Sequence, residues 1–303
     1  MTLAAEKKIP LTVLIAAKNE AINLPRCLEA LKPAQRVVVL DSDSEDATAT
    51  IAQHHGAEVV QFKYEGGYPK KRQWALDNLV IETPWVFLLD ADEVVPSGLW
   101  AEIAVELERP DSRDAYLVRK GFHFLGRPFR YGGFSHAAIL LLRTGHGRFE
   151  HLFDNSPIDL DMEVHERVVV QGQVGQLKTA LIHEDFKGLE AYIARHNHYS
   201  SWEARLRYHY LKTGWYGETT IKPRLFGNTQ ERRRFFKSFV VRLPFEPQAW
   251  FFYHYFLRLG FLEGRAGLIA CQIRSSYIAQ TRAKLYELKK GAHWSSTQNR
   301  GFL

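Results

Sequence analysis

The chain has 303 residues, 46% of them hydrophobic and 24% charged, a composition near the globular average that excludes a disordered or collagen-like chain. The length is sufficient for one large domain, or for a domain with an appendage. The net charge of +6 conceals a split: residues 1–185 carry 20 Lys and Arg against 27 Asp and Glu, a net of −7, whereas residues 186–303 carry a net of +13. We therefore expect two different kinds of partner for the two halves.

Cysteine use and hydropathy bear on the compartment. Cys27 and Cys271 are too few and too far apart for a disulfide framework or a Cys-rich zinc site, which suits a reducing compartment. The first ten residues contain no apolar stretch of signal-peptide length. The longest apolar segment, Ala249–Leu262, is shorter than the roughly 20 residues that span a bilayer. These observations predict a cytoplasmic protein without a transmembrane helix.

The first ninety residues alternate between two kinds of hydrophobic pattern. Short continuous apolar runs predict strands over Leu11–Ala17, Arg36–Leu40, Glu58–Phe62 and Trp85–Leu89. Apolar residues at helical spacing predict helices over Glu20–Leu31, Thr48–His55 and residues 69–81. This order predicts an α/β fold with a mostly parallel sheet and helices on both faces. Ligands of such sheets bind at the carboxyl ends of the strands.

Acidic residues follow two of these strands where the strands end. Asp41 and Asp43 follow the second strand, and Asp90 and Asp92 follow the fourth. Helix capping is an alternative role for Asp41 and Asp43. Two carboxylates at i and i+2, such as Asp90 and Asp92, can hold a hard divalent ion that also binds substrate phosphates. Since no Gly-rich phosphate loop follows the first strand, the dinucleotide-binding and P-loop classes lack their characteristic motif.

Taken together, four motifs resemble family 2 glycosyltransferases with the GT-A fold, a Rossmann-like mixed sheet that binds nucleotide-diphosphosugars. They are Ile15-Ala-Ala-Lys-Asn-Glu20, Val39-Leu-Asp-Ser-Asp-Ser-Glu-Asp46, Gly67-Tyr-Pro-Lys-Lys-Arg-Gln-Trp-Ala-Leu76 and Leu88-Leu-Asp-Ala-Asp-Glu93. The likeness continues through Met162–Val170, Leu181–Asp185 and Gly260–Gly267. It is strongest to the branch of lipopolysaccharide-core β-1,4-glucosyltransferases and related surface-polysaccharide enzymes.

The resemblance implies a donor site. Asp41 would accept a hydrogen bond from the base imide, which favours a uracil nucleotide. Lys71 or Arg72 would meet the base–ribose region or the diphosphate, and a solvated-face role for both is the alternative. The nucleotide-binding residues implied are Ala16, Asn19, Glu20, Asp41, Lys71, Arg72, Asp90 and Ala91.

The resemblance also implies a metal site. Asp92 would bind Mg²⁺ or Mn²⁺ directly, Asp90 would lie near the ribose and the metal, and His183 would complete the site. The cation would neutralise charge on the departing UDP. A histidine satisfied within the core, or capping a helix, is the alternative for His183.

Glu166 matches the acidic position of the family's general base, which removes the proton of the acceptor hydroxyl in an inverting reaction. Its neighbour His165 is assigned to the acceptor side. Gly172 and Gly175 predict a hairpin that returns the chain to His183 and brings it towards Glu166. A surface ion pair with Arg167 or Arg143 is the alternative for Glu166. Three other carboxylates remain candidates for the base: Asp159, Asp161 and Glu163.

The basic half is rich in aromatic residues. A long helix is predicted over Leu189–Leu211, followed by the cationic run Arg232, Arg233 and Arg234 and the aromatic segment Trp250–Phe256. Basic and aromatic residues interleaved at lengths too short to span a bilayer fit helices at a membrane interface. The alternatives are a helical bundle packed on the catalytic domain or on a second copy in a homo-oligomer. Nucleic acid would use the same charges, but no motif for it accompanies them, so no nucleic-acid partner is predicted.

These observations predict a GT-A catalytic domain over residues 1–185 and a helical, membrane-associating region over residues 186–303. We expect an inverting, metal-dependent enzyme on the inner face of the plasma membrane. It would move a hexose, glucose first, from a UDP-sugar to a lipid-linked saccharide or lipopolysaccharide-core acceptor. Transfer to polyprenyl phosphate is the alternative, and a nucleotidyltransferase is disfavoured because Lys18 is the only basic residue after the first strand.

Overall fold

The computed structural model describes residues 8–152, 161, 163, 166–219, 222–227, 231–233, 235–236 and 244–291. These residues belong to two units. The first contains the described residues up to Phe129, residues 134–149 and the described residues from 161 to 187. The second contains residues 130–133, Glu150 to Leu152 and the described residues from Gly188 onwards. The chain therefore passes between the units more often than the single predicted boundary at residue 185 implies.

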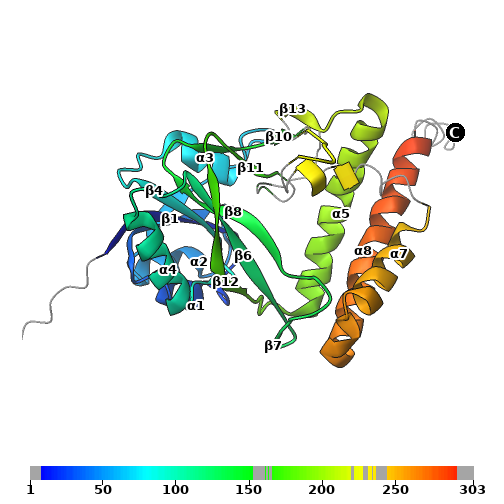
Figure 1. Ribbon diagram of the computed structural model, residues 1–303, viewed down its shortest axis with the longest axis horizontal. Coiled ribbons are helices and arrows are strands. Elements are labelled where there is room, and N and C mark those ends of the chain that lie inside the picture. Colours follow the sequence, from blue (N-terminus) through cyan, green and yellow to red (C-terminus); the bar gives the residue numbers. More distant parts are fainter. Residues whose placement is uncertain are drawn as a thin grey trace, which may run out of the picture. The chain divides into compact units, whose positions relative to one another are not determined.

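The N-terminal half of the first unit is a parallel sheet (Figure 1). Its strands run in the order β3 (Glu58–Gln61), β2 (Ala34–Asp41), β1 (Ile9–Ala17) and β4 (Trp85–Asp90), and all three neighbouring pairs are parallel. This confirms the α/β fold and the strands predicted from the apolar runs. The runs are continuous in β1 and β4 because helices cover both faces of the sheet, so successive side chains on either face are buried.

The helices between these strands are shorter than predicted. They are α1 (Leu24–Glu29), α2 (Thr48–His54) and α3 (Lys71–Asn78). Helix α1 begins four residues later than expected because Asn19 takes a left-handed conformation (φ 54°) and Pro25 lies in the first turn, where its missing N–H has no helical partner to lose. The loop around Asn19 and Glu20 is thereby left at the sheet edge.

The other half of the sheet is mixed. It continues from β4 through β8 (His136–Arg143), β6 (Ala115–Phe124) and β12 (Val174–His183) to β5 (Glu93–Val94), with β7 (Arg127–Pro128) paired to β6. Strand β8 is antiparallel to both β4 and β6, whereas β12 is parallel to β6. Helix α4 (Ser97–Glu108) follows β5. The mixed sheet with flanking helices is the GT-A architecture expected from the resemblance.

The hairpin predicted around Gly172 and Gly175 is wrong. Strand β11 (Val168–Val170) pairs with β9 (Gly147–Phe149) in a separate two-stranded sheet, and β12 joins the main sheet. The turn between them is fixed to the start of β6, because Asp114 accepts the Gln173 N–H at 2.7 Å and fills the space where a Cβ at Gly172 (φ 130°) would lie. The two strands therefore diverge into different sheets.

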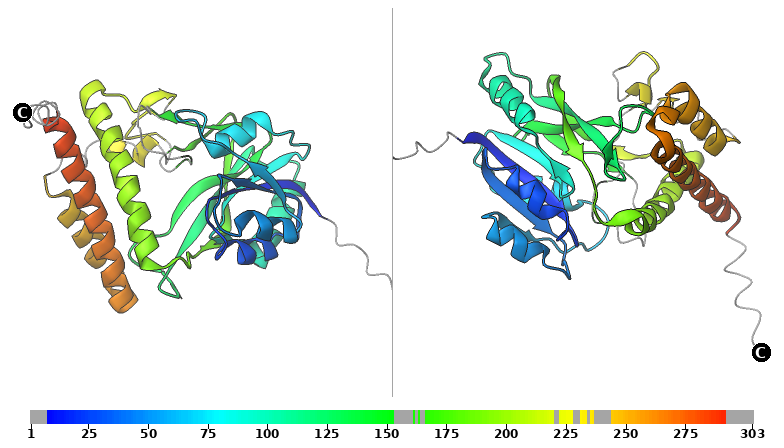
Figure 2. Two further views of the ribbon diagram at one scale, coloured as in Figure 1. Left: turned by 180° about the vertical axis from the view of Figure 1, so that it is seen from behind. Right: turned by 90° about the horizontal axis from the view of Figure 1, so that it is seen from below.

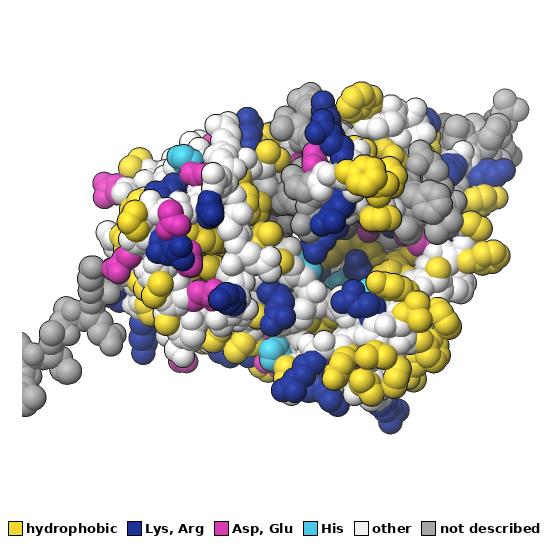
Figure 3. All heavy atoms as spheres, viewed as in Figure 1, with side chains coloured by type: hydrophobic (Ala, Val, Ile, Leu, Met, Phe, Trp, Pro, Cys, Tyr) yellow, Lys and Arg dark blue, Asp and Glu magenta, His cyan; other side chains and the backbone are white. Residues whose placement is uncertain are grey.

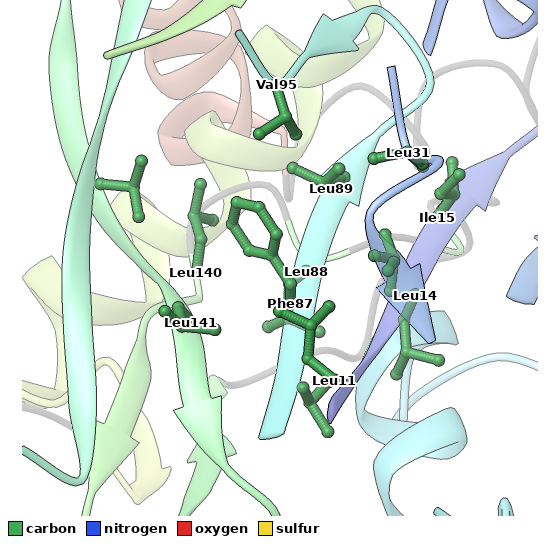
Figure 4. Close-up of a cluster of buried hydrophobic side chains, with 14 of the residues drawn as sticks. Leu11, Leu14, Ile15, Leu31, Phe87, Leu88, Leu89, Val95, Leu140 and Leu141 are labelled. Atoms are coloured by element: carbon green, nitrogen blue, oxygen red, sulfur yellow. The ribbon is translucent and has the colours of Figure 1, made fainter. Parts of the chain in front are cut away.

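The core of the first unit lies around the central strands. Figure 4 shows Phe87, Leu88 and Leu89 of β4 between Leu14 of β1 and Leu140 of β8. The β4 and β1 side chains are fully or almost fully buried, and burial of each such side chain stabilises the fold by about 1.5–3 kcal/mol. Cys27 lies in this core as a free thiol, and burial raises its pKa well above the usual range. The rigid centre of the sheet fixes the positions of the strand ends.

The second unit is built on two long helices, α5 (Gly188–Thr213) and α8 (Gly264–Lys290), which lie side by side (Figure 2). Helix α7 (Glu246–Phe252) packs on α8, and strands β10 (His151–Leu152) and β13 (Gly217–Thr219) form a small sheet. The helix predicted from Leu189 is confirmed as α5. None of the helices within the described ranges is long and apolar enough to cross a membrane.

Buried ion pairs join the helices of this unit. Arg207 of α5 binds Glu203 at 3.0 Å and Glu246 of α7 at 2.8 Å, and all three side chains are buried. Tyr277 of α8 donates its hydroxyl hydrogen to Glu203 at 2.6 Å. Because every charge has a close partner, this network fixes the relative positions of α5, α7 and α8. Cys271 of α8 is also a buried free thiol, and burial raises its pKa to about 11.

Candidate active site

The carboxyl ends of the parallel strands bring the predicted donor residues to one edge of the sheet. In the strand register Ala17 is opposite Asp41, and Ala16 is opposite Asp90. Ala91, which follows β4, is buried. The acidic residues that end β2 and β4 therefore flank the end of β1 on either side.

Asp41 is buried and already hydrogen-bonded. Ser44 donates its backbone N–H (3.3 Å) and its hydroxyl to the Asp41 carboxylate, and Gln61 of β3 donates from its amide at 3.0 Å. The capping alternative for Asp41 and Asp43 is wrong, because Asp46 accepts the Thr48 N–H at the start of α2. Asp41 is thus held in a fixed orientation at the end of β2.

The loop after β1 is tied to the loop after β2. Asn19 accepts the Glu45 N–H at 2.8 Å and donates its own backbone N–H to the Ser44 hydroxyl at 2.9 Å. Glu20 forms an ion pair with Lys187 and accepts a hydrogen bond from Asn23 at 2.9 Å. Burial raises the pKa of Glu20, and the ammonium of Lys187 opposes the increase. These contacts hold the loops that follow β1 and β2 together.

Three consecutive cations at the start of α3 each bind a different carboxylate. Lys70 lies 2.7 Å from Glu166, Lys71 lies 3.0 Å from Asp161, and Arg72 forms a short ion pair with Asp90. Lys71 also donates to the Ala17 carbonyl at 2.8 Å, which ties α3 to the end of β1. Lys70, Lys71 and Arg72 are all buried, so the solvated-face alternative for Lys71 and Arg72 is wrong.

Glu163 caps the same helix. One of its carboxylate oxygens accepts the Gln73 N–H at 3.0 Å and the other accepts the Arg72 N–H at 3.3 Å. Burial raises the pKa of Glu163, and Arg72 opposes the increase. A carboxylate is favoured at a helix N-terminus because it satisfies N–H groups that have no helical partner. This capping role distinguishes Glu163 from Glu166 as a candidate base.

A buried charge cluster lies beneath Asp90. Lys120 of β6 lies 2.7 Å from both Asp90 and Glu93, and Glu93 accepts the Asp90 N–H at 2.9 Å. Burial alone would raise the pKa of Asp90, but Arg72 and Lys120 outweigh it and hold that pKa well below its usual range. For Lys120, burial is outweighed by the Asp90 and Glu93 carboxylates, and its pKa is raised. Asp90 is therefore a permanently charged group between two cations.

Asp92 and His183 form the pair that best fits a metal. Asp92 Oδ2 lies 3.3 Å from His183 Nε2, and both side chains are partly open to solvent. Strand β12 positions the histidine through its pairing with β5, and the Glu184 N–H donates to the Asp92 carbonyl at 3.0 Å. Burial lowers the pKa of His183, but Asp92 and Glu93 outweigh burial and raise it to about 9. The pair thus brings one oxygen donor and one nitrogen donor within 3.3 Å of each other.

Within the described residues, no group of three or more His, Cys, Asp or Glu side chains is arranged to hold a metal ion. This agrees with the geometry around Asp90, whose two oxygens face Arg72 and Lys120. Asp92 and His183 still fit a cation such as Mg²⁺ or Mn²⁺, because such ions are commonly held by one or two protein side chains together with substrate phosphates and water. The donor set present is thus incomplete without a phosphate ligand.

The family follows from comparison with known proteins. Residues 12–148 match the family model described as "Glycosyl transferase family 2". The chain carries a family 2 glycosyltransferase domain.

The chain is similar over almost its whole length to two relatives. The lipopolysaccharide core biosynthesis glycosyltransferase LpsC of Rhizobium meliloti is 28% identical over 286 residues, which cover 92% of this chain and 93% of the relative. An uncharacterized glycosyltransferase of Rickettsia bellii is 26% identical over 93% of this chain and 87% of the relative. Among solved structures, S. aureus TarS 1–349 aligns with a TM-score of 0.44 and 14% identity, covering 94% of this chain and 93% of that one.

The remaining predicted residues divide into two groups. Arg232 and Arg233 are exposed in the second unit. His165, Arg234 and the alternative base Asp159 lie outside the described residues.

Glu166 binds Lys70, which the sequence did not single out; the predicted alternatives were Arg167 and Arg143. Arg143 lies near Asp114 and over the ring of Trp85.

The Lys70–Glu166 pair should contribute strongly to the stability of the fold. Both side chains are about 95% buried, at 4% and 5% exposure, so Lys70→Met leaves a buried carboxylate without its ammonium partner. We expect the free energy of unfolding, measured by urea denaturation, to fall by about 3–5 kcal/mol. The exposed Lys32→Met is the matched control and should change it by less than about 0.5 kcal/mol.

The double variant Lys70→Met with Glu166→Gln separates charge from packing. Because it removes both charges together, it should recover most of the stability that Lys70→Met loses. If Lys70→Met alone is as stable as the control Lys32→Met, the Lys70–Glu166 ion pair does not form in solution.

Proposed function

We propose that this chain is an inverting, metal-dependent hexosyltransferase that uses a UDP-sugar and acts on a lipopolysaccharide-core or other lipid-linked saccharide. The observation that carries the proposal is the pairing of Asp92 with His183 at the carboxyl edge of the sheet, next to Asp90 and its cations. The acceptor class is supported by the name of the Rhizobium meliloti relative, which is similar over nearly all of both chains.

The donor nucleotide would bind across the ends of β1 and β2. Ala16, Asn19 and Glu20 line one side, and Asp41 faces the base with its orientation fixed by Ser44 and Gln61. An acceptor oxygen in that place selects a base with an N–H at the matching edge, as uracil has. Ala91 follows at the end of β4, where its small side chain leaves room for the ribose.

The donor diphosphate would lie between the cations of α3 and the metal pair. Lys71 and Arg72 supply positive charge on one side, and Asp92 and His183 would hold the divalent cation on the other. When bound, the cation neutralises the negative charge that develops on the departing UDP. We assign Asp90 to a positioning role, because its oxygens orient Arg72 and Lys120 towards this region.

Glu166 is the proposed general base. Its carboxylate would take the proton of the acceptor hydroxyl while the hydroxyl oxygen forms its bond to the anomeric carbon. The bond from that carbon to the diphosphate oxygen breaks at the same time, and its electron pair leaves with UDP. Attack from the side opposite the leaving group inverts the configuration. The Lys70 ammonium, 2.7 Å away, orients the Glu166 carboxylate.

A lipid-linked acceptor places the enzyme at a membrane. We propose that it works at the inner face of the plasma membrane, with the excess of +13 in residues 186–303 directed to anionic lipid. The exposed Arg232 and Arg233 would contribute to this attraction.

Thermal-shift measurements with nucleotides and Mn²⁺ test the proposed donor. With UDP-glucose at 100 times its Kd, the folded state gains about 2.7 kcal/mol, which corresponds to a rise in Tm of several degrees. We expect EDTA to reduce the rise in Tm strongly. UDP, used with Mn²⁺ in place of UDP-glucose, should reproduce much of this rise. A shift with GDP- or ADP-sugars and none with UDP compounds would refute the uracil assignment. No shift with any nucleotide sugar would refute the function.

A further inference from the structure

The connection between α7 and α8 exposes a cluster of large apolar side chains. Helix α7 continues into a π-helical turn, Tyr253–Leu257, and a 3-10 turn, Gly260–Glu263, precedes α8. Phe252, Phe256, Leu257, Phe261 and Leu262, here called the apolar tip, are each between 43% and 63% exposed. Figure 3 shows hydrophobic side chains gathered at the lower right, over the end of the helices drawn in orange in Figure 1.

The backbone of the apolar tip is held firmly from within its own unit. His254 Nδ1 donates to the Gly132 carbonyl at 2.6 Å, and the Gly132 N–H donates to the Arg258 carbonyl at 2.8 Å. The buried Glu263 accepts the N–H groups of Arg130 and Tyr131 at 2.6 and 2.7 Å. These bonds fix the turn in the conformation that displays the apolar side chains.

Two glycines make this turn tight. A Cβ at Gly267 would lie 2.2 Å from the Gly260 carbonyl oxygen, and one at Gly260 would lie 2.7 Å from the His254 carbonyl oxygen. The start of α8 therefore packs directly against the turn. The backbone of the tip is therefore held closely while its apolar side chains remain exposed. A rigid, exposed apolar cluster of this kind marks a surface that another phase or molecule covers.

The charges around the apolar tip indicate what covers it. Arg258 and Arg265 are exposed within and beside the tip, and Arg130 is exposed on the segment bound to it. Between Pro247 and Tyr286, Glu263 is the only acidic residue, and its side chain is buried. An apolar cluster edged by arginines complements a bilayer, whose anionic headgroups lie above apolar chains.

A second copy of the chain complements the tip less well. In a symmetric dimer the same patch faces itself, so Arg258 and Arg265 would meet the equivalent arginines with no exposed acid of the tip to compensate.

We propose that the apolar tip inserts into an anionic bilayer, with Arg258 and Arg265 at the level of the lipid phosphates. This proposal specifies which surface of the chain contacts the membrane. It rests on the proposed function only in taking the acceptor to be linked to lipid. The contact is a helix-hairpin end that includes Phe252 and Phe256 of the aromatic segment singled out in the sequence, and it lies apart in sequence from Arg232 and Arg233.

Vesicle co-sedimentation of the full chain tests this surface. We expect binding to phosphatidylcholine vesicles that contain 30% phosphatidylglycerol, weakening as salt rises, and little binding to pure phosphatidylcholine. Arg258→Gln with Arg265→Gln should weaken binding about 25-fold, since each cation contributes about five-fold. Phe256→Ser with Leu257→Ser should weaken it at least about 10-fold, because two inserted apolar side chains are lost.

The matched control is Val105→Ser with Arg119→Gln, which removes one exposed apolar side chain and one exposed cation from the first unit. It should bind like the parent chain, and far-UV circular dichroism should confirm that every variant is folded. Vesicle binding unaffected by both tip variants would overturn the proposal. The proposal would also be overturned if the parent chain does not bind vesicles but forms a dimer, and the double variant Phe256→Ser with Leu257→Ser dissociates that dimer.

The same preparations separate this proposal from the proposed function. The tip variants should keep the full thermal shift with UDP-glucose and Mn²⁺, because the donor residues lie in the first unit. Vesicle binding without any nucleotide shift would refute the proposed function but not the apolar tip, and a nucleotide shift without vesicle binding would refute the apolar tip alone.

Discussion

Asp92→Asn is expected to abolish the metal-dependent binding of UDP and to lower turnover at least about 10³-fold. The substitution keeps the size of the side chain but removes the negative charge that lies 3.3 Å from His183 Nε2. One neutral oxygen and one imidazole are a weak site for Mg²⁺ or Mn²⁺, whose preferred ligands are carboxylates and phosphates. Loss of the cation removes several kcal/mol of stabilisation from the departing diphosphate.

Calorimetric titration of UDP with and without Mn²⁺ measures the effect on binding. Asp111→Asn is the matched control, because Asp111 is an exposed carboxylate of the same unit that pairs with Arg109. The control should bind UDP and Mn²⁺ like the parent chain. If Asp92→Asn retains undiminished binding that EDTA still abolishes, the cation is held elsewhere and the assignment to Asp92 fails.

Glu166→Gln is expected to preserve donor binding and to lower turnover at least about 10²-fold. Glutamine retains the shape of the side chain but cannot accept the proton of the acceptor hydroxyl, and general-base assistance is typically worth about 10²- to 10⁴-fold. Turnover is measured as UDP release with a saccharide acceptor, and donor binding by the thermal shift with UDP-glucose.

Loss of folding would also lower turnover, because Glu166→Gln leaves the Lys70 ammonium buried without its charge partner. The double variant with Lys70→Met removes that buried charge and should be folded but still slow. Asp161→Asn tests the neighbouring carboxylate and should reduce turnover less. Near-normal turnover of both Glu166 variants would transfer the role of base to another carboxylate of this segment.

The parallel half of the fold was predictable because burial leaves a direct trace in the sequence. Strands β1 and β4 lie between two layers of helices, so their residues are apolar on both faces, and the polar residues begin where the strands end. Parallel pairing then places Asp41 and Asp90 at one edge without any knowledge of side-chain packing. The acidic edge follows from topology alone.

The cations that neutralise this acidic edge of the sheet were harder to predict from the sequence. Lys120 lies in the middle of β6, where a lysine usually faces solvent, and only the pairing of β6 with β12 and β8 places it beneath Asp90 and Glu93. Lys70 is adjacent to the predicted Lys71 and Arg72, but its partner Glu166 is almost a hundred residues away. A possible signal was present: each of the three consecutive cations needs an anion when buried.

The hairpin between β11 and β12 was predicted wrongly for a similar reason. Two apolar stretches separated by glycines are typical of a hairpin, yet β11 finds its partner in β9 and β12 finds its partners in β6 and β5. Non-local pairing decides between these arrangements, and a single sequence contains no direct measure of it. His183 reaches Asp92 through the pairing of β12 with β5 rather than through a hairpin.

The burial of both cysteines makes the native chain a convenient background for labelling. Cys27 and Cys271 are the only cysteines in the sequence, and burial raises the pKa of both thiols, so little reactive thiolate is present at neutral pH. A cysteine introduced at the 63%-exposed Leu257 would therefore react selectively with a maleimide carrying a polarity-sensitive fluorophore. Its emission would report directly whether this position leaves water when lipid is added.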